Sequence, residues 1–224
     1  MATAALRRWW NGFVQSNEPT LPDSFEESLL RAGFAQGADH LETITKGLSA
    51  SNARQRVLAL RAGARQNVLS ADNWSSAFSD TDVDVRRESL NLFAHHEPSS
   101  SALLDQVLGL LSDADALVVD GAVFALGEHL YVPSVDALCS IASSHDDARC
   151  RESAVAALGA IGDDRARETI LNALEDKPPV RRRAIVALSN FDGPDIDAAL
   201  EKASEDRDWQ VRAAVSQLGR EEND

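Results

Sequence analysis

Apolar residues recur along the chain at the spacing of amphipathic α-helices. In several stretches the apolar positions lie three or four residues apart. These stretches are Leu103, Leu104, Val107, Leu110 and Leu111; Val135, Leu138, Ile141 and Ala142; and Ile170, Leu171 and Leu174. Between the predicted helices, no alternation of apolar and polar residues is long enough for a β-strand. The pattern therefore predicts an all-α protein.

A longer period accompanies the helical one. Seven apolar anchor positions return every 30 to 33 residues: Leu30, Leu60, Phe93, Leu126, Leu158, Leu188 and Leu218. Each period has room for two helices, of which the first carries the anchor and the second follows a polar or proline-containing turn. The first helix is expected to end at a glycine in the left-handed conformation, at Gly33, Gly63, Gly127, Gly159 and Gly219. A regular series of such hairpins predicts an α-solenoid.

Charged residues repeat in step with the anchors. Aspartates occur near the end of each second helix, at Asp80, Asp113, Asp146, Asp176 and Asp206. Six residues before the anchors lies a partly basic column, Arg54, Arg87, Asp120, Glu152, Arg182 and Arg212. An aspartate before a helix can cap its free N–H groups, and stacked turns that carry Asp and Arg can pair between neighbouring repeats. Both columns are therefore predicted to be structural.

The repeat divides the chain into two parts. Residues 23–224 are predicted to form the solenoid, with about six to seven repeats, the last of which keeps only its first helix. Residues 1–22 are predicted to form an N-terminal capping helix and a linker, because two prolines interrupt helical hydrogen bonding. Trp9 and Trp10 give this helix a broad apolar surface. Two interpretations stay open for them: a cap over the first repeat, or an exposed docking or dimer surface.

The repeat resembles a known family. In the run from Asp206 to Gly219, an acidic residue is followed by Val-Arg, then by Ala, and finally by Leu-Gly. This pattern is similar to the HEAT repeat, and in particular to its bilin-lyase-like (PBS lyase) subclass. The similarity is specific from about Asp72 to the end of the chain. The resemblance implies an armadillo-like helical solenoid in the form of a curved right-handed superhelix. It also implies a convex face lined by the first helices and a concave face lined by the second helices.

Composition limits the location and the partners of the protein. The formal net charge is −14 and the pI is about 4.7, so the chain as a whole repels nucleic acids and anionic membranes. No window approaches the roughly 20 apolar residues that cross a bilayer, and the N-terminus lacks the continuous apolar stretch of a signal peptide. A cytoplasmic protein is expected. Cys139 and Cys150 do not make a disulfide framework and are expected to be free thiols.

Enzymes built on HEAT-like repeats use residues that this chain does not arrange in the same way. Deoxyhypusine hydroxylase binds iron through His-Glu pairs before the anchor, where this sequence has no histidine. Alkylpurine DNA glycosylases use an aspartate and tryptophans, and Asp72, Trp74, Asp206 and Trp209 match them in residue type. The plainer expectation is that each of these rings covers a neighbouring turn. No catalytic, cofactor-binding or metal-binding residue is assigned.

The function predicted from the sequence is a non-catalytic scaffold that binds a protein or peptide on its concave face. The second helices, which are expected to line that face, carry Asp105, Asp136, Glu168, Glu175, Asp195, Asp197 and Glu201. Their charge predicts a partner with a basic contact segment and an affinity that falls as salt rises.

The candidate partner-binding residues are Trp9, Trp10, Arg181 and Arg183. The two arginines are chosen because their run with Arg182 can clamp an anion or a carboxylate. Two alternative functions stay open. One is a bilin-lyase-like enzyme or accessory subunit, and the less favoured one is a DNA-binding or glycosylase protein.

Overall fold

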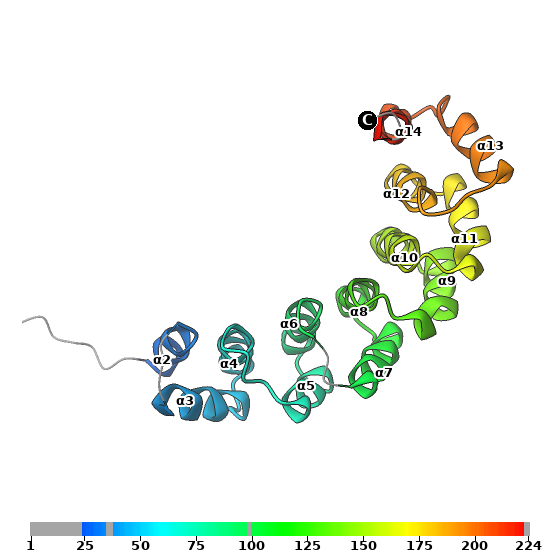
Figure 1. Cartoon of the computed structure of the whole chain (residues 1–224). Helices are drawn as coiled ribbons and strands as arrows, with labels where there is room; N and C mark the ends of the chain where they lie inside the picture. Colours follow the sequence, from blue (N-terminus) through cyan, green and yellow to red (C-terminus); the bar gives the residue numbers. More distant parts are fainter. Residues whose placement is uncertain (1–23, 35–37, 98–99, 222–224) are drawn as a thin grey trace, which may run out of the picture.

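The structure is a computed structural model of the chain, and it describes residues 24–34, 38–97 and 100–221. Within these ranges all regular secondary structure is helical. The helices alternate between two rows that follow a curved path, which confirms the predicted all-α solenoid (Figure 1). The predicted N-terminal helix and linker, residues 1–22, lie outside the described residues.

One row contains the even-numbered helices, and the other contains the odd-numbered ones (Figure 1). The even-numbered row consists of α2 (Phe25–Ala32), α4 (Ala53–Arg65), α6 (Val83–Phe93), α8 (Ala116–Glu128), α10 (Ala148–Ile161), α12 (Pro178–Leu188) and α14 (Trp209–Glu221). The odd-numbered row consists of α3 (Ala38–Leu48), α5 (Ala71–Phe78), α7 (Ser101–Gly109), α9 (Val135–Ser144), α11 (Arg167–Asn172) and α13 (Pro194–Ala203), with short 3₁₀ turns beside α7, α9 and α11. Of the described helices, none is long and apolar enough to cross a bilayer.

The even-numbered row lies on the inner side of the curve and the odd-numbered row on the outer side (Figure 1). This arrangement is the reverse of the one implied by the family resemblance. Small residues at the contacts between even-numbered helices explain it. A Cβ atom on Gly159 would lie 2.5 Å from the Cβ of Ala187, and one on Gly127 would lie 2.8 Å from the Cβ of Ala157. Because α8, α10 and α12 approach one another so closely, their row follows the shorter, inner path.

These close contacts also account for glycines that were expected to be left-handed caps. That prediction was wrong, because Gly33 has a right-handed φ of −68° and the other four lie inside their helices: Gly63, Gly127, Gly159 and Gly219. The left-handed cap of α10 is Gly162, with φ of 68°. Gly127 and Gly159 are needed for close helix packing rather than for backbone conformation.

The inner helices begin at side chains that cap them. In α4, α6, α8 and α10 the capping side chain accepts a hydrogen bond from the backbone N–H two residues later, and these caps are Asn52, Asp82, Asp115 and Asp147. α12 instead begins with two prolines, whose missing N–H groups need no cap. Each capping residue satisfies one of the free N–H groups at a helix start.

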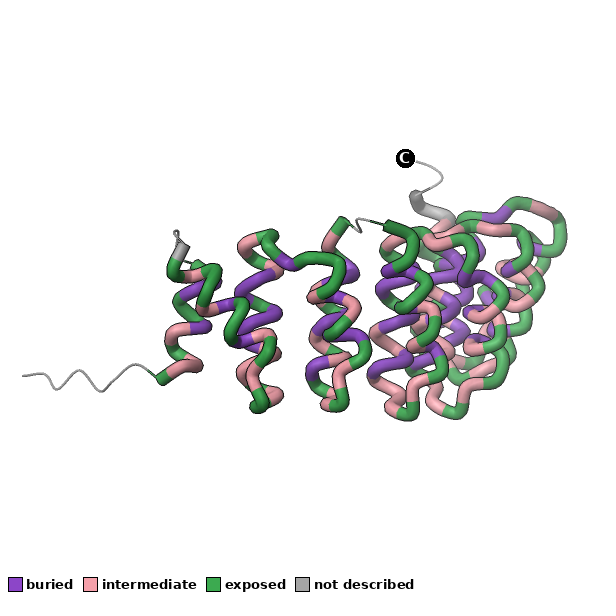
Figure 2. The backbone as a smooth tube through the Cα atoms, turned by 90° about the horizontal axis from the view of Figure 1, so that it is seen from below, coloured by how far each residue is buried: buried purple, intermediate pink, exposed green. Residues whose placement is uncertain are grey.

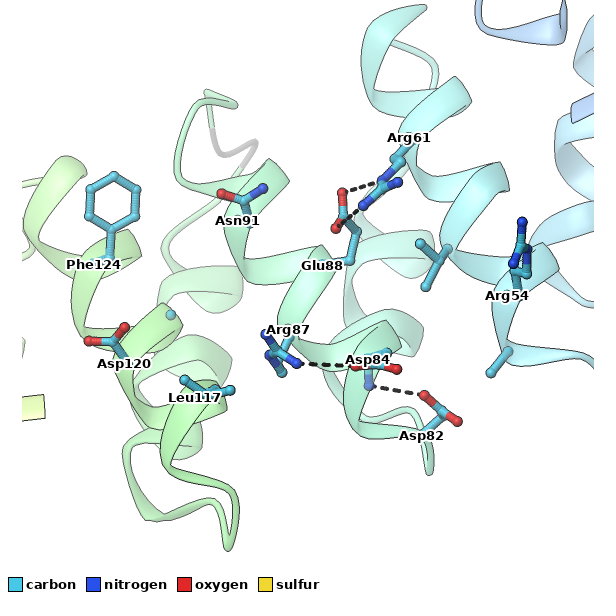
Figure 3. A pocket seen from close by; sticks show the side chains of 13 residues that line it. Arg54, Arg61, Asp82, Asp84, Arg87, Glu88, Asn91, Leu117, Asp120 and Phe124 are labelled. Carbon is cyan, nitrogen blue, oxygen red and sulfur yellow. Dashed lines mark hydrogen bonds and ion pairs between the residues drawn. The ribbon is translucent and has the colours of Figure 1, made fainter. Parts of the chain in front are cut away.

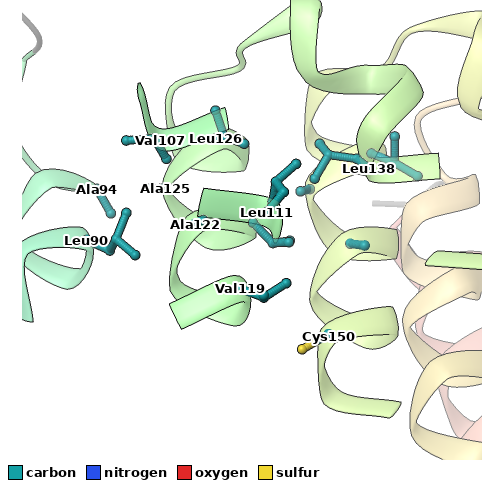
Figure 4. Packing of buried hydrophobic residues seen from close by; sticks show 14 of the residues in the cluster. Leu90, Ala94, Val107, Leu111, Val119, Ala122, Ala125, Leu126, Leu138 and Cys150 are labelled. Atoms are coloured by element: carbon teal, nitrogen blue, oxygen red, sulfur yellow. The ribbon is translucent and has the colours of Figure 1, made fainter. Parts of the chain in front are cut away.

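Helices of both rows contain buried residues (Figure 2), and most of these residues are apolar. A cluster of these side chains runs from Leu60 in α4 to Ile196 in α13 without interruption. Figure 4 shows its centre, where Leu90, Leu126 and Leu138 come from three different helices. Since no hairpin buries its apolar face alone, each repeat depends on its neighbours for stability.

Candidate functional site: the inner groove

The inner side of the solenoid contains three connected depressions, all lined by even-numbered helices. The first, of about 700 Å³, lies across α4, α6 and α8. The second, of about 280 Å³, lies across α8, α10 and α12, and the third, of about 300 Å³, lies between α12 and α14. Phe124 lines the first and the second, and Arg183 lines the second and the third. We call this continuous surface the inner groove.

Charged side chains in the first depression neutralise one another (Figure 3). Nε and Nη2 of Arg61 donate to the two carboxylate oxygens of Glu88, at 2.7 and 2.8 Å. Nη1 of Arg87 donates to a carboxylate oxygen of Asp84 at 3.2 Å. The hydrogen bond to Glu88 raises the pKa of Arg61, so this guanidinium stays charged. This part of the groove is polar, and each of its three arginines, Arg54, Arg61 and Arg87, is paired with a carboxylate.

Apolar side chains are exposed farther along the groove. Phe124 on α8 is 42% exposed, and the ring of His95 lies edge-on to it at a centroid distance of 5.9 Å. Val186 on α12 and Trp209 at the start of α14 are 45% and 66% exposed. Large exposed side chains of this kind on one concave surface are typical of a binding site.

A second feature, the Arg–Asp ladder, ties successive hairpins together. In each of its pairs, Nε and Nη2 of an arginine donate to both carboxylate oxygens of an aspartate about 25 residues later, at 2.6 to 3.0 Å. The pairs are Arg56–Asp80, Arg86–Asp113, Arg151–Asp176 and Arg181–Asp206. The arginine Nη1 also donates to a backbone carbonyl in the turn before its own helix. Bidentate, charge-assisted bonds of this kind hold the turns in a fixed geometry.

The ladder is interrupted in the middle of the solenoid. Each ladder arginine is the fourth residue of its helix, and in α8 this position is Val119, which is buried. The position of the partner aspartate is taken by His145, whose Nδ1 accepts from the backbone N–H of Asp147. Both members of the missing pair are therefore replaced together, so that neither charge is left unpaired.

The predicted basic column does not match the ladder. The expected pairing between neighbouring repeats exists, but Arg54 and Arg87 line the first depression of the groove and Arg182 lines the third. Arg212 is in ladder position, where its Nη1 donates to the carbonyl of Asp206. Asp146 is exposed, with His145 in the ladder position instead.

The spacing between cap and anchor explains this error. The anchor Leu60 lies 8 residues after the cap Asn52, whereas Phe93 lies 11 residues after the cap Asp82. Counting backwards from the anchors therefore shifts the register between repeats. The first predicted anchor, Leu30, is 54% exposed, and the residue before it, Leu29, is the buried one.

The candidate partner-binding residues have different positions in the structure. Arg181 is only 4% exposed and belongs to the ladder, so the expectation that it clamps a ligand was wrong. Arg183 lines the inner groove. Trp9 and Trp10 lie outside the described residues.

The carboxylates expected in the groove lie on the outer helices instead. Asp105, Asp136, Glu168, Asp195 and the others belong to odd-numbered helices or to the turns beside them. Several pair with basic groups of the same row, as in Arg165–Asp136, Arg167–Asp195 and Lys202–Glu175. Because these charges face outward, they give no reason to expect a basic partner segment in the groove.

Neither cysteine has the properties of an activated nucleophile. Cys150 is buried, and the loss of hydration raises the pKa of its thiol to about 11. Cys139 is half-buried, and both thiols are free. Among the described residues, no three metal-ligating side chains are grouped so that they could hold an ion.

The two described tryptophans differ from each other. Trp74 is 1% exposed and packs against Phe78 and Phe93, so it belongs to the core. Trp209 was expected to cover a neighbouring turn, but it is exposed in the third depression of the groove. The sequence does set Trp209 apart, because it is the first residue of α14, whereas the other inner helices from α4 onward begin with Ala, Val or Pro. Phe124 and Val186 gave no such signal.

Comparisons with known proteins agree with this geometry. Residues 135–219 match the model of the HEAT repeats. This part of the chain is therefore similar to a HEAT-repeat array. Among curated proteins, no sequence matches the chain.

Solved structures share the HEAT-like fold at low sequence identity. YibA of Escherichia coli has a TM-score of 0.62 at 15% identity, with 89% of this chain and 75% of that chain covered. An engineered protein has a TM-score of 0.60 at 18% identity, with coverage of 81% and 95%. A designed armadillo repeat protein in complex with the peptide (KR)4 has a TM-score of 0.54 at 13% identity, with coverage of 88% and 98%. These similarities concern the fold.

Proposed function

We propose that the protein is a non-catalytic scaffold whose inner groove binds an extended segment of a partner protein. The observation that carries this proposal is the continuity of the groove, in which Phe124 and Arg183 each join two depressions. Phe124 and Trp209 expose aromatic rings on the same surface, and aromatic rings are frequent energetic anchors of interfaces. A stack of packed repeats presents such a surface without being ordered on binding.

The length of the groove suits a peptide. From α4 to α14 there are five steps between neighbouring inner helices, and packed helices lie about 8–10 Å apart. The groove is therefore about 40–50 Å long, which about 12–15 residues in extended conformation span at about 3.3 Å each. The similar fold of a designed armadillo repeat protein that was solved with a peptide supports this kind of occupant.

The test is the selection of peptides and the mapping of their binding site. A displayed library of random 15-residue peptides would be selected on the immobilised protein, and the affinity of the enriched peptides measured by fluorescence anisotropy. Ala156 lies in the second depression, so Ala156→Arg places a long charged side chain across the path of the peptide. We expect this variant to lose binding by more than about tenfold, because the blocked contact is central to the interface.

The matched control is Ala198→Arg, the same change at an exposed position of α13 on the outer row. It should bind the selected peptides like the unmodified protein. Circular dichroism would verify that both variants keep their helix content. If no peptide is enriched, or if both variants bind equally well, the proposed function is wrong.

A further inference from the structure

The third depression of the inner groove, which we call the α12–α14 pocket, has its own chemical character. Its walls are the apolar side chains of Val186 and Trp209 and the basic side chains of Arg182 and Arg183. Trp209 is the most exposed large apolar side chain on the inner groove, at 66%. Apolar and cationic groups lie side by side within about 300 Å³.

The two arginines of this pocket are poorly neutralised. Nη1 of Arg182 donates to the neutral side-chain oxygen of Gln210 at 2.8 Å. Nη2 of Arg183 lies 3.7 Å from a carboxylate oxygen of Glu152, which is beyond hydrogen-bonding distance. Within the described part of the chain, no carboxylate is closer to either guanidinium. Both groups therefore keep most of their capacity to bind an anion.

Several other exposed arginines are already paired, whereas Arg65, Arg207 and Arg212 also form no ion pair among the described residues. Arg61, Arg149 and Arg165 each lie within 3 Å of a carboxylate oxygen. In a chain of net charge −14, carboxylates are abundant, and two adjacent arginines without a close one are unusual. A guanidinium binds a carboxylate through two parallel hydrogen bonds, and such a pair is stronger than a bond between neutral groups.

We infer that the α12–α14 pocket binds an acidic stretch of a partner protein in which carboxylates flank a large apolar side chain. The carboxylates bind Arg182 and Arg183, and the apolar side chain packs against Trp209 and Val186. A carboxylate between the arginines replaces the weak contact between Arg183 and Glu152. This inference rests on the proposed function, and it reverses the sign of charge that the sequence predicted for the partner.

An acidic peptide fits this site better than a nucleic acid does. The pocket offers two guanidiniums only. The rest of the groove contributes arginine–carboxylate pairs and the carboxylates of Asp82 and Asp120 in its first depression, and those of Glu128 and Glu152 in its second. A polyanionic strand along the groove would meet these carboxylates and the field of a strongly acidic protein. A short stretch with one or two carboxylates meets only the pocket.

The first experiment compares three synthetic 12-residue peptides that share the same phenylalanine and leucine positions. They differ only at the two positions that flank the phenylalanine, which are both glutamate, both glutamine or both lysine, and a single-stranded DNA of 12 nucleotides serves as the competing polyanion. Binding to the full chain is measured by fluorescence anisotropy at low and high salt. We expect the glutamate peptide to bind about tenfold more tightly than the glutamine peptide at low salt, and this advantage to shrink at high salt.

Variants then locate the binding. Arg182→Gln with Arg183→Gln should weaken the glutamate peptide by about tenfold or more and leave the glutamine peptide nearly unchanged. Trp209→Ala should weaken both peptides, because it removes the apolar contact. Arg165→Gln with Arg167→Gln, an equal loss of charge on the outer row, is the matched control and should change neither.

The outcomes separate this inference from the proposed function. If the lysine peptide binds best and Ala156→Arg abolishes its binding, the groove function stands and the acidic partner is wrong. Tighter binding of the DNA than of the glutamate peptide, lost on removal of the two arginines, also overturns the acidic-peptide assignment. If neither these peptides nor any library peptide binds, the proposed function fails, and the inference fails with it.

Discussion

Replacing Asp206 by asparagine removes one carboxylate from the Arg–Asp ladder at almost constant side-chain volume. Asp206 accepts hydrogen bonds from Nε and Nη2 of Arg181, at 2.9 and 2.8 Å, and from the backbone N–H of Asp208 at 2.7 Å. The side chains of the pair are only 5% and 16% exposed. The substitution therefore leaves a charged guanidinium with little access to water and without its counter-ion.

The expected cost is about 2–3 kcal/mol of unfolding free energy. A hydrogen bond to a charged group contributes about 1.5–3 kcal/mol, and removing one partner of a fully buried pair costs about 3–5 kcal/mol. Asparagine keeps one acceptor oxygen, and Asp206 keeps some contact with solvent, so the lower part of the combined range applies. The matched control is Asp195→Asn, which breaks a similar bidentate pair with Arg167 that is much more exposed. Solvent screening makes its effect much smaller.

The cost depends on pH in a defined direction. The hydrogen bonds from Arg181 hold the pKa of Asp206 below its usual value of 3.8 in the folded state. A carboxyl whose pKa is lowered by folding stabilises the protein above its unfolded pKa of about 3.9, and this stabilisation is lost as pH falls through the lower folded-state pKa. The difference between the unmodified protein and Asp206→Asn is therefore full at pH 7 and shrinks below about pH 4.

The assay is urea-induced unfolding followed by circular dichroism, at pH 7 and at intervals down to pH 3. The midpoint shift multiplied by the slope gives the change in unfolding free energy. If Asp206→Asn destabilises the protein no more than Asp195→Asn, or if its effect is the same at pH 3 as at pH 7, then the ladder does not stabilise the solenoid in the way described.

Two further predictions concern packing and thiol chemistry. Gly159→Ala should destabilise the protein by about 1–3 kcal/mol, because its new Cβ lies 2.5 Å from the Cβ of Ala187. The control, Gly109→Ala, adds a Cβ that meets nothing within 4 Å, and it should stabilise the protein by about 0.5–1 kcal/mol in the same urea assay. Iodoacetamide at pH 7.5 should alkylate half-buried Cys139 well before buried Cys150, whose pKa is about 11, as peptide mass spectrometry would measure. Equal midpoints for the two glycine variants, or faster labelling of Cys150, would contradict these arguments.

The fold was largely predictable because it is periodic. The 30- to 33-residue interval and the helical spacing of apolar residues are local properties of the sequence, and the structure confirms an all-α solenoid. The register inside each repeat was less accessible. Arg87 and Arg86 are adjacent in sequence, yet only Arg86 lies in the ladder. A difference of one residue turns a side chain by about 100° around the helix, from one surface to another.

The binding surface was predicted less well than the fold. Arg183 was predicted to bind a partner and lines the inner groove, whereas Arg181 was given the same role although it is buried. Trp209 and Phe124 were not identified as groove residues. Their roles depend on exposure, which is decided by the neighbouring helices and not by the residues beside them in sequence.

The chain's own pattern was sufficient to establish helices and hairpins, because these arise from contacts between residues close in sequence, and its regular repeat was sufficient to predict that the hairpins stack. The direction of curvature was decided only in three dimensions. It depends on how closely successive inner helices approach, at contacts such as Gly159 with Ala187. That direction places the odd-numbered helices and their carboxylates outside, and it places Phe124, Arg183 and Trp209 in the groove. The charge and shape offered to a partner therefore follow from the packing distance between helices that lie about 30 residues apart in the sequence.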